Sequence, residues 1–397
     1  MSSVSRLGYI GGRKESAQGS YLAPGFDFAV TKCDAVDVYD PLRDESFRNN
    51  DTGLQGLYQG PGQSSFDFEM AAYADALPYL FRAIIGPDTV TTAGVTTTLT
   101  ADCVVGGGLG GSPLSFTANP GNNAIIQISD TGGANLEYVQ IGTVSGSGPY
   151  TANVTTPSTG TRYAHTAAGG SVISQSTHSF KQNPAAAQTS WSFTKYDVVA
   201  NGLPSHSRGF PGCKCSELGI KIDPKAMVTA SAKFTGWLSA EVADQVGPSF
   251  SPVQPALGWQ WTMTNGGASS TRGLSYDMTL KRPVEAIHSS DGVQQPRETF
   301  QGVFDFSGSY KALFESDADL NLYLQYLQQP CTAVLTQPVV LGGSVITMTS
   351  TKSGWNKGQV SWDDIYVTAS FDIDGIYNAT DGGAFAATVT NFVSTAY

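Results

Sequence analysis

Charge is scarce in this sequence of 397 residues, because Asp, Glu, Lys and Arg together make up only 14% of the chain. Acidic residues outnumber Lys and Arg by 33 to 22, which leaves a formal net charge of −11. Nucleic-acid binding proteins gain affinity when Lys and Arg displace the counterions of phosphates. A sparse, acidic charge set therefore argues against a protein that grips DNA or RNA. It suits a surface that DNA passes without adhering.

Long apolar runs are also missing. The most apolar block, Leu77–Ile85, contains Arg82 and is about half as long as the roughly 20 apolar residues of a membrane-spanning helix. The first twenty residues, MSSVSRLGYIGGRKESAQGS, hold no apolar segment of the kind found in secretion signals. We therefore expect no membrane insertion, and synthesis in the cytoplasm.

Cysteine is sparse and odd in number, with five residues in the chain. Such a set does not form the disulfide framework of a small secreted protein. Cys213 and Cys215 share one face of an expected strand, but a zinc site needs a second pair of Cys or His ligands, and only His206 lies nearby. The pattern favours buried thiols, and we predict no metal site and no cofactor.

Motifs for catalysis are absent as well. The glycine-rich run 107–111 is not followed by the Lys-Ser or Lys-Thr pair of a phosphate-binding loop. His178-Ser179 and His288-Ser289 lack the sharp turn that presents a nucleophile. We therefore predict no catalytic residues and no enzyme activity. Solvated side chains are expected for all four histidines, which lie in Ser/Thr-rich contexts: His165, His178, His206 and His288.

Glycine and aromatic residues are abundant by contrast, with 45 Gly and an aromatic fraction of 11%. Together with many Thr residues, this composition is typical of an all-β protein with numerous turns. We predict a mainly β fold, with a sandwich or barrel body, two short flanking helices and one small inserted β-domain.

The body is organised around the stretch SFDFEMAAYADALPYLFRAIIG, which begins at Ser65. Phe66 and Phe68 alternate with acidic residues, which predicts a half-buried strand. The apolar period then changes to that of a helix, with Asp75 as the expected N-cap and Gly86 as the stop. The buried face of this first scaffold helix is predicted to contain Leu77, Leu80, Phe81, Ile84 and Ile85.

A second stretch, VFDFSGSYKALFESDADLNLYLQYL, repeats this plan of a Phe-Asp-Phe strand, an acidic cluster and a short amphipathic helix. Internal duplication and chance matching both remain open as explanations of the repeat. The shared order of strand and helix follows from the periodicity alone. The apolar face of the second scaffold helix is predicted to contain Leu320, Tyr323, Leu324 and Leu327.

Alternating runs predict that most of the remaining body consists of strands. Residues 218–222 and 228–234 flank the turn Asp223-Pro224-Lys225-Ala226, which predicts a long hairpin. Other predicted strands contain Trp191 and Phe193, residues 274–280, residues 365–373 and residues 385–393.

Between Asp88 and His178 the composition changes, with four acidic residues, one Arg and no Lys. Short β-like runs occur at 124–128, 136–141 and 171–173, between turns rich in Gly, Ser and Thr. About ninety residues suffice for a small β-barrel or sandwich. We therefore predict a domain at 88–178 that is inserted between a first part of the body at 1–87 and a second part at 179–397.

Residues 40–51 predict a long, charged and exposed loop. Loops of this length are usually functional or disordered, so both an interaction arm and plain flexibility remain open. The charged residues of this candidate arm are Asp40, Arg43, Asp44, Arg48 and Asp51.

Trp259 and Trp261, two residues apart, are the strongest candidates for a binding platform. Two indoles on one face of a strand can stack on a sugar ring, whereas packing in a core or between subunits is the commoner use of such a pair. Both interpretations remain open.

The order of these elements resembles the major tail tube proteins of long-tailed (siphophage-type) bacteriophages. The likeness is carried by GRKESAQGSYLAP, by LPYLFRAIIG, by the hairpin ELGIKIDPKAMVTASAKFTGW, and most strongly by the block from LSYDMTLKRP to ADLNLYL. The inserted segment, from NLEYVQIGTVSGSGPY to RYAHTAAGGSVI, is similar to small β-modules of other virion proteins. The resemblance covers most of the chain as a pattern, and the insertion is its departure from a minimal tube subunit.

The resemblance implies a structural β-sandwich subunit of the virion tail. It implies that copies assemble into hexameric rings, which stack into a tube that conducts DNA during genome ejection. The implied partners are other copies of the chain, the tape measure protein, the tail terminator and the distal tail proteins, while DNA passes through the lumen without specific binding. The implied place of residues 40–51 is between successive rings, and that of the insertion is the outer surface. The residues that face the lumen stay unknown.

Two alternatives remain open. A secretion-system tube protein shares the implied fold. A cell-surface glycan-binding adhesin, or a virion decoration protein, would use the Trp259 and Trp261 pair or the inserted domain.

Overall fold

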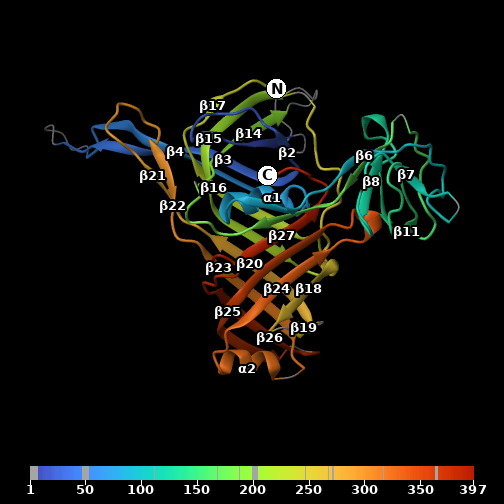
Figure 1. The fold of residues 1–397 in the computed structure, drawn as a ribbon. Coiled ribbons are helices and arrows are strands. Elements are labelled where there is room, and N and C mark those ends of the chain that lie inside the picture. Colours follow the sequence, from blue (N-terminus) through green and yellow to red (C-terminus); the bar gives the residue numbers. More distant parts are fainter. Residues whose placement is uncertain are drawn as a thin grey trace.

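The computed structural model describes residues 8–46, 53–110, 112–167, 169–186, 188–198, 204–245, 247–266, 268–270, 272–315, 317–362 and 365–397. An 18-stranded antiparallel assembly forms the body, and smaller sheets extend from it (Figure 1). The prediction of a mainly β fold with few helices is confirmed. Among the described residues, no helix has the length and hydropathy needed to cross a membrane.

The first set of body strands, which we call the first unit, comes from residues 9–236, on both sides of the inserted segment. Its strands are β1 (Tyr9–Lys14), β2 (Phe26–Phe28), β3 (Val30–Asp44), β4 (Gly56–Ala71), β14 (Trp191–Val198), β15 (Pro204–Ile222) and β16 (Thr229–Gly236). They pair in the antiparallel order β2-β1-β14-β15-β16-β4-β3.

The second set, which we call the second unit, follows in the C-terminal half. Its strands are β18 (Trp261–Asn265), β19 (Ala268–Ser270), β20 (Gly273–Lys281), β23 (Asp305–Leu313), β24 (Gln329–Thr336), β25 (Val345–Trp362) and β26 (Val367–Gly375). They pair in the antiparallel order β19-β18-β24-β25-β26-β23-β20. A short hairpin, β21 (Val284–Ile287) and β22 (Glu298–Gln301), lies between β20 and β23 in sequence.

The two units join where β15 pairs with β20, with Leu218 opposite Leu280. Each unit also has one strand that returns to its long strand: β17 (Ala240–Glu241) pairs with β15, and β27 (Ala386–Asn391) pairs with β25. In Figure 1 the first unit lies in the upper half of the body and the second unit in the lower half.

The predicted hairpin around residues 223–226 is confirmed as β15 and β16, which pair over residues 214–235. Trp191 and Phe193 are buried in β14, also as predicted. The predicted strand at 365–373 begins later, because β26 starts at Val367 and Ile365 is 90% exposed.

The first helix, α1 (Leu77–Ile84), buries Leu77, Leu80, Phe81 and Ile84 as predicted, and Ile85, which is also buried, is its C-cap residue. The prediction of Asp75 as N-cap is wrong, because the cap position is Ala76 and no side chain caps the helix. A turn precedes the helix, and the amides of Ala76 and Leu77 already donate to the Tyr73 carbonyl. The backbone thus takes the place of a capping carboxylate.

The second helix, α2 (Ala318–Leu324), is shorter than predicted. Leu320 and Tyr323 pack partly against the core, whereas the side chains of Leu324 and Leu327 are 60% and 38% exposed. Leu327 lies beyond the helix, since Tyr326 adopts a left-handed φ of 51° and ends the helical path. Of the four residues predicted for its apolar face, Leu320 and Tyr323 therefore contact the core, Leu324 is exposed, and Leu327 lies outside the helix. In Figure 1 α2 lies at the far lower end of the body.

One apolar core runs through both units. In the first unit Phe66 stacks on Phe193, and Phe193 lies edge-on to Phe234, with ring centroids 4.9 and 4.7 Å apart. In the second unit Trp261 stacks on Tyr276 at 5.9 Å. Burial of such aromatic side chains supplies much of the stability of a sheet-on-sheet body.

The segment between the two parts of the first unit folds into small sheets with their own apolar core. Its strands are β6 (Thr96–Thr98), β7 (Leu114–Phe116), β8 (Ile125–Ser129), β9 (Glu137–Ile141), β10 (Tyr150–Ala152), β11 (Val154–Thr156) and β12 (Ser171–Ser174). Leu99, Phe116, Ile126 and Val139 are among the buried residues of this core. The strands at its ends, β5 (Asp88–Thr92) and β13 (Ser176–Phe180), pair with each other, and β13 also pairs with β27 of the body.

Candidate assembly surfaces

Eight strands form one uninterrupted antiparallel sheet in the order β3-β4-β16-β15-β20-β23-β26-β25. Alternate side chains of these strands enter the core, and the others form a surface that we call the polar face. Residues that lie directly opposite one another on neighbouring strands form three rows across the polar face. The rows are Asp34, Asp67, Lys233, Glu217, Lys281 and Asp305; Lys32, Glu69, Ser231, Gly219, Thr279, Ser307 and Asp374; and Thr229, Lys221, Asp277, Ser309, Asp372 and Lys357.

Opposite charges neighbour one another along the polar face. Glu217 forms an ion pair with Lys233 at 2.8 Å, and Lys281 lies 3.9 Å from its second oxygen. The hydrogen bond to Glu217 raises the pKa of Lys233. Exposed ion pairs of this kind add little stability individually, so their main effect is on the character of the surface.

The three rows hold eight carboxylates and five lysines, with no aromatic or large apolar side chain. Single-stranded nucleic acid is held by aromatic stacking and by excess positive charge, and double-stranded DNA by clusters of Lys and Arg. The polar face offers neither. Its chemistry is that of a hydrophilic, mildly acidic wall.

The sequence left these residues unassigned, although the signal was present. Each alternating run used to predict a strand also names its polar half: Asp67 and Glu69 stand between Phe66, Phe68 and Met70. What the sequence lacked was the strand order, which decides that these polar halves share one surface.

Both outer strands of the eight-stranded sheet have an open edge. Among the described strands, β3 pairs only with β4, and the part of β25 from Gly354 to Trp362 pairs only with β26. Long open edges are templates for further strand pairing, and soluble proteins usually shorten or cover them. These two edges are therefore candidate sites of self-association.

The first part of the candidate arm, residues 40–44, is the end of β3 in a hairpin with β4. Asp40, Arg43 and Asp44 lie in β3, paired with β4, so the prediction of a loop over these residues is wrong. The strand continues past residue 40, and residues 41–44 pair with residues 56–59, a partner that inspection of residues 40–51 alone does not reveal. Arg48 and Asp51 lie outside the described residues. The hairpin projects from the body, beside β21 and β22 (Figure 1).

Apolar side chains are exposed along this arm. Val36, Val38, Leu42, Leu57 and Tyr58 are each between 48% and 62% exposed. Exposed apolar groups of this kind are common at protein interaction sites, so the arm is a candidate for one. Asp44 lies near the arm's end, where hydrogen bonds from Ser46 lower its carboxyl pKa.

Two of the predicted solvated histidines are buried, so that prediction is wrong for them. In the inserted segment His165 Nε2 lies 2.6 Å from Glu137 and Nδ1 lies 3.3 Å from Asp130. Burial alone would lower the pKa of His165, but the hydrogen bond and charge of Glu137 and the charge of Asp130 raise it. Turn-like local sequence concealed these long-range partners.

His178 lies in β13 and is fully buried. Its Nδ1 is 2.9 Å from Asp88, and its Nε2 is 2.8 Å from the Val393 carbonyl. Asp88 also accepts the Tyr397 amide at 2.9 Å. This network ties both ends of the inserted segment to the C-terminus of the chain.

The cysteine and tryptophan candidates take structural positions. Cys213 and Cys215 are buried in β15, and burial raises the pKa of both thiols. Trp259 lies in the 3₁₀ turn Gly258–Gln260 and is 62% exposed, whereas Trp261 begins β18 and is 9% exposed. The turn separates the two indoles, so they do not form one platform. Within the described residues, no group of three or more His, Cys, Asp or Glu is placed to hold a metal ion.

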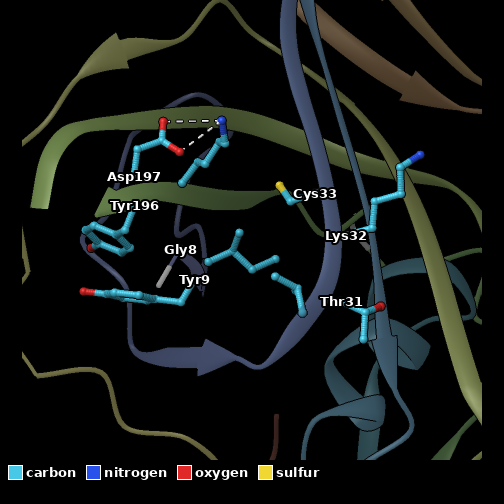
Figure 2. A pocket seen from close by; sticks show the side chains of 10 residues that line it. Gly8, Tyr9, Thr31, Lys32, Cys33, Tyr196 and Asp197 are labelled. Atoms are coloured by element: carbon cyan, nitrogen blue, oxygen red, sulfur yellow. Dashed lines mark hydrogen bonds and ion pairs between the residues drawn. The ribbon is translucent and has the colours of Figure 1, made fainter. Parts of the chain in front are cut away.

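A cavity of about 330 Å³ lies between the start of β3, at its open edge, and the paired strands β1 and β14. Figure 2 shows Tyr9 and Tyr196 on one wall and Cys33 on another, with Thr31 and Lys32 toward the outside. The two tyrosine rings stack at 4.6 Å. Burial raises the pKa of Cys33 to about 12, so its thiol stays protonated and acts as an apolar lining group.

Comparison with known protein families finds a match that spans most of the chain. A family model described as phage tail tube protein matches residues 2–358. A search of curated proteins finds no match.

Proposed function

The chain belongs to the phage tail tube protein family, and from this premise we propose that its copies close into rings that stack into a tube for DNA. The coarser part of this statement follows from the family itself: the chain is a structural protein of the virion tail that associates with itself to form a tube. The rings, their stacking and the conduction of DNA are the proposal.

The continuous sheet of eight strands carries the proposal. A sheet with a core-facing side, a polar side and two open edges is suited to closure with further copies, because a closed barrel leaves no edge unpaired. The resemblance to siphophage tube proteins supports six tube units around each ring.

We place the polar face on the lumen. With eight carboxylates, five lysines and no aromatic groups, this face carries a net negative charge, so it would repel the phosphate backbone during genome ejection and offer no stacking surface for bases. The triple substitution of Glu69, Asp277 and Asp372 by Lys should leave tube assembly intact and slow DNA ejection about tenfold or more, by attraction of phosphates. Unchanged ejection would contradict a lumenal position, and Val105→Lys in the inserted segment is the charge control.

The arm formed by β3 and β4 is proposed to contact neighbouring copies, including those of the next ring, through its exposed apolar side chains. The inserted segment at 88–178 is proposed as a separate domain on the outside of the tube. Its distinct apolar core supports that division of the chain into 1–87, 88–178 and 179–397. Contacts with the tape measure protein, the tail terminator and distal tail proteins are proposed from the family resemblance.

Electron microscopy tests the proposal directly. Negative-stain images of the purified protein or of the virion should show rings or tubes of uniform bore. A protein that stays monomeric, in a particle whose tail tube is built from another chain, would overturn it.

A further inference from the structure

The two units repeat one plan, strand for strand. In order along the chain, β1, β2, β3, β4, α1, β14, β15 and β16 correspond to β18, β19, β20, β23, α2, β24, β25 and β26. The pairing order β2-β1-β14-β15-β16-β4-β3 maps under this correspondence onto β19-β18-β24-β25-β26-β23-β20. The short returning strands β17 and β27 correspond as well. The faint sequence echo between the two strand-helix stretches thus belongs to a repeat of the whole unit.

The joint between the units shows how one unit receives the next. The end of β15 pairs with β20 over residues 217–222. The turn after β15 docks on the residues before β18, where the Val228 amide donates to the Ala256 carbonyl and the Gly258 amide to the Ala226 carbonyl. Further along the β20–β23 connection, Arg282 and Gln301 donate to the carbonyls of Ile84 and Ala83, which covers the end of α1.

The equivalent elements of the second unit, the end of β25 and the helix α2, have no such partners among the described residues. The end of β25, which corresponds to the end of β15, has an open edge from Gly354 to Trp362. Trp362, the last residue of β25, and Ile365, which precedes β26, are 89% and 90% exposed. Around α2, which corresponds to α1, Leu324 and Tyr326 are 60% and 77% exposed.

The elements that could receive the end of β25 lie at the opposite edge of the eight-stranded sheet, in the first unit. The edge of β3, which corresponds to β20, is open. The cavity lined by Gly8, Tyr9, Thr31, Cys33 and Tyr196 opens at the start of β1, which corresponds to the start of β18 where the turn after β15 docks (Figure 2). The exposed arm of β3 and β4 corresponds to the β20–β23 connection that covers α1.

We propose that two copies of this chain join head to tail by repeating the internal joint. The end of β25 in one copy pairs with β3 of the next, and the side chains of Trp362 and Ile365 enter the cavity beside Cys33. The arm of the receiving copy covers α2 of the donating copy. Strand directions alternate through the eight-stranded sheet, so this joint is antiparallel like every other pair in the body.

Each chain then occupies two positions of a ring. Resting on the proposed function, in which six tube units surround the lumen, a ring closes with three chains rather than six. A head-to-tail interface closes into a ring only when the rotation at every joint matches. Three of the six joints in this ring lie within single chains, where the covalent chain already holds the two units together.

Complementary variants test the joint. Trp362→Asp combined with Ile365→Asp removes the entering side chains, and Cys33→Trp, on the wall of the cavity, fills it, with Gly8→Trp as a second filling variant. Sedimentation should find each variant monomeric alone, because each retains one working end. An equimolar mixture should form a 1:1 dimer, with at least tenfold weaker association in the single-variant samples. Val104→Asp combined with Val105→Asp, at two apolar positions of the inserted segment that are each 67% exposed, should assemble like the unaltered chain.

Failure of the mixture to dimerise, with both variants folded by circular dichroism and the unaltered chain assembling, would overturn the joint. The number of chains per ring is tested in assembled tubes by mass per length and by rotational symmetry in electron microscopy. We expect three masses of 41.7 kDa per ring. Six chains per ring would overturn the inference and leave the tube function standing, whereas a tail tube made of another protein would overturn the function itself.

Discussion

The helices α1 and α2 hold the same place in two matching units, yet one is buried and the other lies partly in solvent. Phe81 and Ile84 of α1 are fully buried, whereas Leu324 at the end of α2 is 60% exposed. Both sequences have an apolar stripe at helical spacing, so the stripe does not account for the difference. What differs is the neighbour: the connection between β20 and β23 of the second unit covers the end of α1, whereas α2 lies at the lower end of the body (Figure 1).

The largest expected effect is a difference between the two helices in how much they contribute to the stability of the monomer. Phe81→Ala leaves a cavity in a packed core and should lower the free energy of unfolding by about 3–5 kcal/mol. Leu324→Ala removes an exposed side chain and should change it by less than about 0.5 kcal/mol in the monomer. Urea unfolding followed by tryptophan fluorescence measures both. A large loss from Leu324→Ala in the monomer would show that α2 is already buried.

The second test concerns the segment that follows α1 and has no equivalent after α2. Deletion of residues 93–175 with a short Gly/Ser join keeps β5, β13 and the Asp88–His178 pair, so the body should fold and assemble. Deletion of 88–178 removes this buried pair and should destabilise the body by about 3 kcal/mol more, since the remaining polar groups lose their partners. Thermal unfolding and electron microscopy compare the two deletions. Equal stability of both products would contradict a role for the pair in the body.

Assembly into a tube should remove the difference in solvent exposure between the two helices. In the tube, amide hydrogen exchange around α2 should slow at least tenfold relative to the monomer, because the arm of the next copy covers it. Amides of α1 should change little, since they are already protected. Exchange around α2 that stays fast in assembled tubes would exclude this part of the proposed joint.

The smallest expected effect depends on pH and lies in the inserted segment. His165 has a pKa raised above 6.5, so its protonated form stabilises the fold fully below the unfolded value, and this contribution is lost as pH rises through the folded pKa. Exchange of amides near residues 126–141 should therefore quicken by about tenfold at most between pH 6 and pH 8, after correction for the intrinsic rate. In His165→Gln this pH dependence should disappear, while amides of α1 serve as the internal reference. Exchange near residues 126–141 with the same pH dependence in both proteins would assign the effect to another group.

Local patterns allowed much of the fold to be predicted. Period-2 alternation identified the hairpin of β15 and β16 and the buried aromatics of β14, because strand geometry places alternate side chains on opposite faces whatever their partner. The same patterns failed where a long-range partner decides the outcome. Residues 40–44 resemble a loop because their partner strand lies beyond residue 55, and His165 resembles a solvated residue because its carboxylates lie 28 and 35 positions away.

The sequence by itself determined the β-rich class, the position of α1, the change of composition at the insertion and the likeness to tail tube proteins. These depend on side-chain periodicity and composition, which are local. Tertiary structure alone decided that polar half-strands join into one acidic wall, that the two units share one pairing order, and that only one of two similar helices is covered. Each of these depends on which strands pair, and backbone hydrogen bonds between strands are the same for every sequence, so the order of pairing emerges only when the whole core is packed.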